Sequence, residues 1–175
     1  HTRFRNVTGV QTCALPILML APAVVVADEP TSALDVSVQA QILNLLMDLQ
    51  ASTKMAMVFI SHNLAVVEHV ADDVMVLFQG SVVEAGPKSQ VLNHPLHPYT
   101  QALQAAVPKL QRVPSPHSSL QTCVQGSVQG SVQASVQGCA FRFRCPHRLD
   151  MCAQSRPQLH EVDGRRVACH LVNTP

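Results

Sequence analysis

Two apolar runs separated by an amphipathic stretch dominate the first half of the chain. Residues 24–26 are consecutive valines, and residues 55–60 are apolar throughout. Apolar runs bounded by polar or turn-forming residues are typical of buried strands in a parallel sheet. Residues 36–50 between them predict a helix with one apolar stripe, which Asp35 or Ser37 can cap. The stripe consists of Val38, Ile42, Leu45, Leu46 and Leu49.

Strand, helix and strand in this order predict a βαβ unit with parallel strands and a right-handed crossover. The carboxyl ends of both strands then meet at one sheet edge, where open α/β folds bind ligands. Asp28 and Glu29 follow the first strand, and His62 follows the second. One carboxylate there can hold a hydrated Mg²⁺, and the other can orient or deprotonate a water. The plain alternative is a surface Asp-Glu-Pro turn at residues 28–30, with His62 as only a helix cap or a surface residue.

The pattern continues with further short elements. A strand over residues 74–78, a turn at residues 79–80 and a strand over residues 81–84 predict a β-hairpin. Asn63 can cap the first of the helices expected around this hairpin. These helices span residues 64–71, 87–93 and 99–106.

Two motifs carry a resemblance to a known family. Residues 27–35, Ala-Asp-Glu-Pro-Thr-Ser-Ala-Leu-Asp, resemble the Walker B strand and D-loop of ABC-type ATPases. Residues 61–63, Ser-His-Asn, resemble the switch-histidine segment of the same family. The resemblance implies an α/β fold: part of a RecA-like P-loop NTPase core with a parallel sheet.

The resemblance also implies a role for each candidate site residue. Glu29 and His62 would be catalytic, with Glu29 acting on the hydrolytic water and His62 contacting the γ-phosphate. Asp28 would bind Mg²⁺ through water. Ser32 and Asp35 would lie at the interface with a second ATP-binding subunit. The implied cofactors are ATP and Mg²⁺.

Residues after the hairpin narrow the resemblance to one subfamily of ABC-type ATPases. Residues 97–100, His-Pro-Tyr-Thr, resemble an element that follows the core in the ATPase subunits of oligopeptide and dipeptide importers. This kinship implies an ATP-hydrolysing subunit for import of peptides or similar small solutes. Its partners would be membrane-embedded permease subunits and a second ATP-binding subunit, identical or different. It would be peripheral, at the cytoplasmic face of the bacterial inner membrane.

Other parts of the family pattern are absent from these 175 residues. The chain contains no G-x-x-x-x-G-K-[ST] loop, no Q-loop and no Ser-Gly-Gly signature. We therefore expect the C-terminal part of a longer protein, inactive by itself. The alternative is a catalytically dead remnant that acts only as an iron–sulfur or zinc binding or interaction module.

The N-terminal residues do not fit the family pattern. Residues 1–17 resemble the conceptual translation of a sequencing adapter and are expected to be foreign to the fold. A secretory signal peptide is disfavoured because the apolar run over residues 13–27 contains two prolines and would include the first strand.

Composition limits the class of partner. Twelve Lys and Arg residues balance eleven Asp and Glu residues, and the net charge is +1. A balanced charge disfavours binding to nucleic acid.

A four-residue repeat, Val-Gln-Gly-Ser and variants, divides the second half of the chain. Glycine disfavours both helix and strand, so a flexible linker is expected over residues 113–138. The predicted segments are residues 1–17 as an artefact, 18–88 as part of the ATPase core, 89–112 as a helical extension, 113–138 as the linker and 139–175 as a Cys-rich C-terminal extension.

The Cys-rich extension offers a second candidate site. Cys139, Cys145, Cys152 and Cys169 supply the ligand number of a [4Fe–4S] cluster or a structural Zn²⁺. Similarity to the C-terminal extension of peptide-importer ATPases implies the cluster. The gaps are wider than C-x₂-C, and four unligated packing cysteines remain the alternative. Disulfides are disfavoured for a protein in the reducing cytoplasm.

Overall fold

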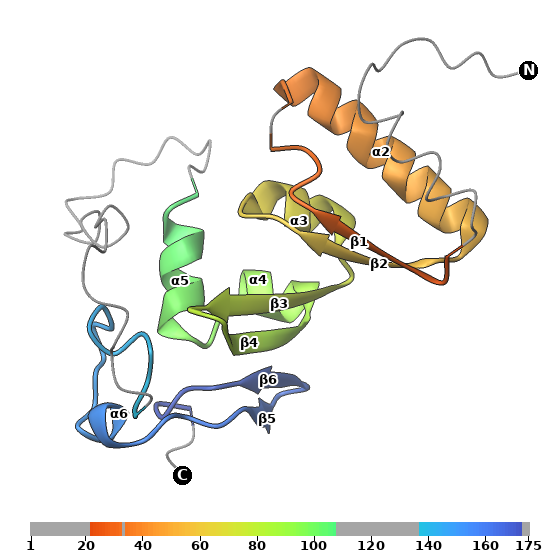
Figure 1. The fold of residues 1–175 in the computed structure, drawn as a ribbon. Helices are drawn as coiled ribbons and strands as arrows, with labels where there is room; N and C mark the ends of the chain where they lie inside the picture. Colours follow the sequence, from red (N-terminus) through yellow and green to blue (C-terminus); the bar gives the residue numbers. More distant parts are fainter. Residues whose placement is uncertain (1–21, 33, 108–136, 173–175) are drawn as a thin grey trace, which may run out of the picture. The chain divides into compact units, whose positions relative to one another are not determined.

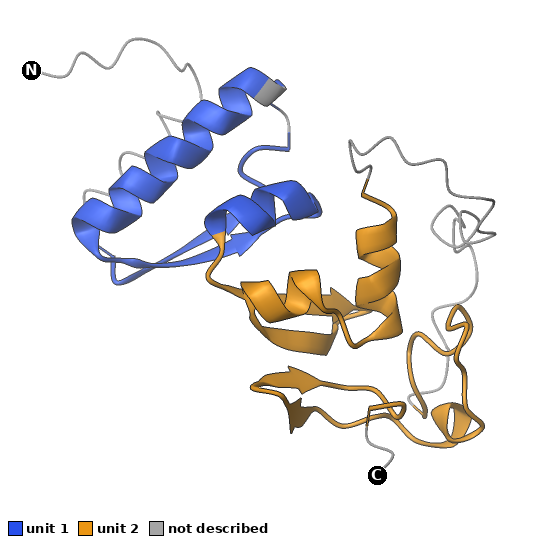
Figure 2. Cartoon of the chain, turned by 180° about the vertical axis from the view of Figure 1, so that it is seen from behind, with its two compact units in different colours: residues 1–70 blue, residues 71–175 orange. Residues whose placement is uncertain are grey.

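The computed structural model describes residues 22–32, 34–107 and 137–172 and has a mixed α/β fold (Figure 1). The predicted α/β class is therefore confirmed. The chain divides into two compact units, unit 1 over residues 1–70 and unit 2 over residues 71–175 (Figure 2). The finer segment boundaries named above stay predictions, and residues 1–17 with most of the linker lie outside the described residues.

Unit 1 contains the predicted βαβ arrangement. Strand β1 (Val24–Asp28) pairs in parallel with β2 (Ala56–Ile60), and helix α2 (Val36–Thr53) lies between them in the sequence. Helix α3 (Leu64–Val70) follows, and the Oδ1 atom of Asn63 accepts the N–H of Ala65 at 3.1 Å, as predicted for its cap.

The start of α2 differs in one detail from the prediction. Asp35 occupies the N-cap position, but its side chain makes no capping hydrogen bond. Its backbone carbonyl instead accepts the N–H of Gln39 at 2.8 Å. The carboxylate of Asp35 therefore takes no part in capping this helix.

The prediction that both strands are buried is wrong for this chain. Val24, Val26 and Val58 are 55%, 64% and 50% exposed. Their neighbours along each strand, Val25 and Met57, are half-buried. Side chains alternate between the two faces of a strand, so one face of this two-stranded sheet is open among the described residues.

Unit 2 is built on a four-stranded antiparallel sheet in the order β3-β4-β6-β5. The predicted hairpin forms its first half, and the turn places Gln79 and Gly80 at φ of 48° and 73°. The strands are β3 (Asp73–Phe78), β4 (Ser81–Pro87), β5 (His160–Val162) and β6 (Arg165–Val167). The helices are α4 (Lys88–Asn93), α5 (Pro98–Ala105) and α6 (Met151–Gln154).

The Cys-rich extension shares this sheet with the hairpin. Glu84 and Ala85 of β4 pair with Val167 and Arg166 of β6. The N–H of Ala168 continues the contact by donating to the carbonyl of Val83 at 2.9 Å. The sequence does not predict β5 or β6, so the structural link between the hairpin and the extension is a new finding.

Aromatic side chains form a further contact between these segments. The ring of Phe141, which is 5% exposed, lies 5.3 Å from that of Phe78 and 5.4 Å from that of Tyr99. Phe78 and Tyr99 lie 4.7 Å apart. Such packed rings stabilise a core by burial and by their tilted geometry.

Among the residues that the structure describes, no helix combines sufficient length with sufficient apolar character to span a bilayer.

Candidate functional site

The carboxylate of Glu29 and the imidazole of His62 are in direct contact. The Nδ1 atom of His62 lies 2.8 Å from Oε1 of Glu29. Parallel pairing of β1 with β2 brings them together, and the N–H of Glu29 donates to the carbonyl of Ile60 at 2.9 Å. Both side chains are solvent-exposed, at 46% and 76%. An exposed pair of this kind adds little stability, so its position is more informative than its strength.

The backbone of Glu29 adopts an unusual conformation. Its φ angle is +43°, in the left-handed region that non-glycine residues seldom enter. Ser32 holds the turn, since its backbone N–H and its hydroxyl both donate to the carbonyl of Glu29, at 3.2 and 3.0 Å. Conformations of this type cluster at functional sites.

The other two candidate carboxylates, Asp28 and Asp35, lie close to Glu29 in the sequence. Asp28 ends β1 opposite Ile60, and its side chain is exposed. Asp35 lies at the start of α2 and is also exposed. In the described part of the chain, no hydrogen bond or ion pair links either aspartate to Glu29 or His62.

Thr31 is a residue of this loop that the sequence analysis missed. It is 4% exposed, and its Oγ1 atom accepts the side-chain N–H of Gln39 at 3.1 Å. This bond fixes the loop after β1 to helix α2. Nothing in the local sequence distinguishes Thr31 from its exposed neighbour Ser32.

The contact between Glu29 and His62 is suited to handling protons. A carboxylate and an imidazole in hydrogen-bond contact can orient a water and move a proton. A nucleotide also needs a cradle for its phosphates, and the 175 residues contain no glycine-rich phosphate loop. The geometry therefore brings together an exposed carboxylate and an exposed imidazole that could act on a water molecule.

The four cysteines of the extension lie in unit 2 as free thiols. The N–H of Cys139 donates to the carbonyl of Cys152 at 2.8 Å. Burial raises the pKa of Cys139, Cys145 and Cys169. Negative charge on neighbouring thiolates raises the pKa of each of these three groups further, and for Cys169 all three other thiolates contribute.

These four cysteines are the metal ligands predicted from the sequence. Within the described ranges, however, no three Cys, His, Asp or Glu side chains are arranged to hold a metal ion. In the described part of the chain, the predicted ligands therefore have no coordination geometry. Metal binding would have to displace thiol protons and turn side chains.

A buried ion pair in unit 2 was not predicted from the sequence. Glu84 has no exposed surface, and its carboxylate accepts the N–H of Leu96 at 3.0 Å and that of His97 at 3.1 Å. Arg165 of β6 is 6% exposed and lies 3.5 Å from the same carboxylate. The Nη1 atom of Arg165 also donates to the carbonyl of Gln90 at 2.8 Å.

His97 is buried beside this ion pair. It is 1% exposed, and burial lowers its pKa to about 4. Its Nδ1 atom accepts the N–H of Tyr99 at 3.0 Å and so caps α5. His97 is therefore a neutral structural residue near pH 7.

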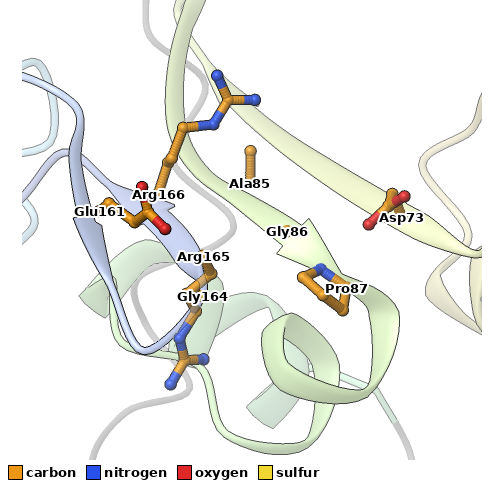
Figure 3. A pocket seen from close by; sticks show the side chains of 8 residues that line it. All are labelled: Asp73, Ala85, Gly86, Pro87, Glu161, Gly164, Arg165 and Arg166. Atoms are coloured by element: carbon orange, nitrogen blue, oxygen red, sulfur yellow. The ribbon is translucent and has the colours of Figure 1, made fainter.

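An open cavity of about 310 Å³ lies against the sheet of unit 2. Figure 3 shows Arg166 and Glu161 on one side, Asp73 on the other, and Ala85 and Gly86 between them. None of the candidate residues predicted from the sequence lines this cavity.

Comparison with known proteins identifies relatives over most of the chain. Residues 83–152 match a family model described as the C-terminal region of oligopeptide/dipeptide transporters. The chain is 50% identical over 156 residues to the dipeptide transport ATP-binding protein DppF of Escherichia coli (strain K12), covering 89% of the chain and 46% of that protein.

Two further relatives are also peptide transport ATP-binding proteins. The di/tripeptide transport ATP-binding protein DppF of Pseudomonas aeruginosa (strain UCBPP-PA14) is 51% identical over 153 residues, covering 87% of the chain and 46% of that protein. A probable peptide ABC transporter ATP-binding protein, y4tS of Sinorhizobium fredii, is 50% identical over 88% of the chain and 43% of its own length. The chain spans less than half the length of these curated relatives. The family inferred from the sequence is thereby confirmed: over most of its length, the chain is related to the ATP-binding proteins of oligopeptide and dipeptide ABC transporters.

Proposed function

We propose that the chain carries the hydrolytic side of the nucleotide site in an ATPase subunit that powers import of peptides or similar small solutes. The contact of 2.8 Å between Glu29 and His62 is the observation that carries this proposal. Glu29 polarises the attacking water, and His62 supports the γ-phosphate. The printed names of the relatives, which describe peptide transport ATP-binding proteins, support the same assignment.

Asp28 is the residue that would hold Mg²⁺. Its carboxylate is exposed at the carboxyl end of β1, and Mg²⁺ binds carboxylates while keeping several of its waters. Mg²⁺ would supply charge neutralisation for the phosphates of ATP. Ser32 and Asp35, in the loop after β1, would contact a second ATP-binding subunit.

A chimera tests the catalytic assignment. The 175-residue chain alone is expected to show no ATP hydrolysis, because it has no phosphate loop. Fusion to the portion of Escherichia coli DppF that this chain does not cover should restore hydrolysis, and Glu29→Gln should then reduce it by about 10²–10⁴-fold. Asp48→Asn, which removes an exposed carboxylate on α2, is the control and should leave the rate unchanged. Hydrolysis by the Glu29→Gln chimera at the parent rate would refute the role of Glu29.

The partners follow from the same family. We propose that the subunit docks on membrane-embedded permease subunits at the cytoplasmic face of the inner membrane and pairs with a second ATP-binding subunit, identical or different. Support comes from relatives named as transport ATP-binding proteins. Co-purification of the chimera with the permease subunits in detergent would test this. A chimera that hydrolyses ATP but never co-purifies would contradict it.

We also propose that Cys139, Cys145, Cys152 and Cys169 bind a [4Fe–4S] cluster, with Zn²⁺ as the alternative. The support is the presence of four free cysteines in unit 2, the ligand number of such a cluster. Anaerobic purification should give brown protein with broad absorbance near 400 nm and about four irons per chain, lost in Cys145→Ser. Colourless protein with zinc would exclude the cluster. Metal-free protein with a folded extension would leave these cysteines as packing residues.

The second candidate function is a metal-binding or interaction module whose ATPase core is inactive. It is favoured by the absence of a phosphate loop from the 175 residues. The chimera separates the two functions, because an inactive core cannot recover hydrolysis that depends on Glu29.

A further inference from the structure

The backbone of Glu29 is held in a conformation that its sequence context opposes. Its φ angle is +43°, whereas a residue before a proline, here Pro30, is normally extended with a negative φ. A non-glycine residue stays in the left-handed region only where surrounding contacts fix it there. The contacts around Glu29 therefore decide where its carboxylate points.

One set of contacts lies within the turn after β1. The N–H and the hydroxyl of Ser32 both donate to the carbonyl of Glu29, at 3.2 and 3.0 Å. The N–H of Leu34 donates to the carbonyl of Thr31 at 3.2 Å. These bonds close the turn, but a turn closed by its own bonds can still pivot as a whole. Ser32 is also exposed, so water competes for its hydrogen bonds.

A second contact attaches the turn to helix α2. Thr31 is 4% exposed, and its Oγ1 atom accepts the side-chain N–H of Gln39 at 3.1 Å. Gln39 is half-buried near the start of α2, where its backbone N–H donates to the carbonyl of Asp35 at 2.8 Å. Hydrogen bonds shielded from water are electrostatically stronger than exposed ones. The bond between Thr31 and Gln39 is therefore a firm anchor between the turn and the helix.

We propose that this hydrogen bond keeps the Glu29 carboxylate against the His62 imidazole, so that Thr31 and Gln39 are positioning residues. Thr31 is two residues after Glu29, and a turn anchored at Thr31 cannot swing away from β2. Glu29 then keeps its φ angle, and its Oε1 atom stays 2.8 Å from Nδ1 of His62. Thr31 and Gln39 act through the backbone of the turn. Only the consequence for ATP hydrolysis rests on the proposed function.

Nuclear magnetic resonance on the full 175-residue chain tests the positioning without nucleotide. One signal is the nuclear Overhauser effect between the N–H and Hα protons of Glu29, which is strong at positive φ. The other joins the side-chain protons of Glu29 to the ring protons of His62. Thr31→Val keeps the shape of the side chain and removes the hydroxyl, so both signals should weaken. The contact should shift about fivefold toward its open form, the factor that corresponds to one net hydrogen bond of about 1 kcal/mol.

Three further variants give matched comparisons. Thr31→Ser retains a hydroxyl and should keep both signals. Gln39→Leu should weaken them as Thr31→Val does, and the double variant should show no further loss, because both substitutions break the same bond. Gln41→Leu is the control, because Gln41 is exposed on the same helix, and it should leave both signals unchanged.

The chimera with DppF adds a kinetic measurement. Thr31→Val should lower kcat about fivefold, in line with the loss of one hydrogen bond, and leave KM for ATP unchanged. The reason is that Thr31 positions Glu29 and is not among the residues proposed to bind ATP. Thr31→Ser should restore kcat, a rescue that a general loss of stability would not give.

The outcomes separate this inference from the proposed function. Unchanged signals in Thr31→Val, or their loss in Thr31→Ser as well, overturn the positioning role, as does a parent chain that lacks both signals. If Thr31→Val does not fold, Gln39→Leu decides in the same way. If the signals behave as expected but the Glu29→Gln chimera hydrolyses ATP at the parent rate, the positioning stands and the proposed function fails.

Discussion

Replacing Glu84 with glutamine is the sharpest test of what holds unit 2 together. The carboxylate is fully buried, and its two oxygens accept the N–H groups of Leu96 and His97. Glutamine keeps the size of the side chain but removes the charge beside the Arg165 guanidinium. It also places an NH₂ donor where one of the two N–H groups needs an acceptor.

The size of the effect follows from these contacts. Removing one member of a buried ion pair costs about 3–5 kcal/mol, because the other charge stays buried. Arg165 is only 6% exposed, so water cannot compensate, although the carbonyls of Gln90 and His94 still accept from it. We therefore expect a loss of about 3 kcal/mol, the lower end of that range. A small domain is stable by only about 5–15 kcal/mol in total.

Tyrosine fluorescence can follow the change. Tyr99 is the single tyrosine and the chain has no tryptophan, so urea unfolding reports on the aromatic cluster of unit 2. With a urea dependence of about 1.5 kcal/mol per molar, the midpoint should fall by about 2 M. Glu161→Gln on β5 removes an exposed carboxylate and should change the free energy of unfolding by less than about 0.5 kcal/mol. Equal midpoints for the two variants would refute the assigned role of the ion pair.

Three further predictions concern the same unit. The pKa of His97 is about 6.5 in the unfolded chain, and burial lowers it to about 4 in the folded chain. The unfolded chain therefore binds more protons between these pH values, and the free energy of unfolding should fall as the pH is lowered through that window, by at most about 1.4 kcal/mol per pH unit. His97→Asn, which can still cap α5, should flatten this dependence in urea titrations, and an unchanged slope would contradict the assignment. Gly86→Ala would place a Cβ 2.6 Å from the Cβ of Arg165, so a loss of about 1–3 kcal/mol is expected; an unchanged midpoint of urea unfolding would argue against this packing. Phe141→Ala should cost about 3–5 kcal/mol and shift the Tyr99 emission, and native-like emission would exclude the aromatic contact.

Local patterns were sufficient to predict unit 1. The apolar runs and the helical spacing between them predicted parallel strands, which place Glu29 and His62 at one sheet edge, and their side chains are in contact there. The solvent exposure of the side chains on β1 and β2 could not be predicted from local patterns. Apolar runs indicate strands, but whether a face is covered depends on neighbouring segments, and Val26 and Val58 are half or more exposed.

The architecture of unit 2 depends on contacts that no local pattern contains. Strands β5 and β6 have only three residues each and include His160, Glu161, Arg165 and Arg166, so they lack the length and alternation that indicate strands. Glu84 pairs with an arginine 81 positions away. A charged residue within an apolar strand indicates that a partner is needed, but not which arginine supplies it.

The pairing of β4 with β6 also affects the order in which unit 2 can form during synthesis. Arg165 leaves the ribosome 81 residues after Glu84, which is about 4–16 s at usual elongation rates. During that interval β4 is an unpaired sheet edge, and such edges promote association between chains. In this interval the Glu84 carboxylate also has no Arg165 guanidinium to pair with. Unit 2 can therefore complete its native sheet only after β6 has been synthesised, and until then the nascent hairpin exposes an unpaired edge that a chaperone could cover.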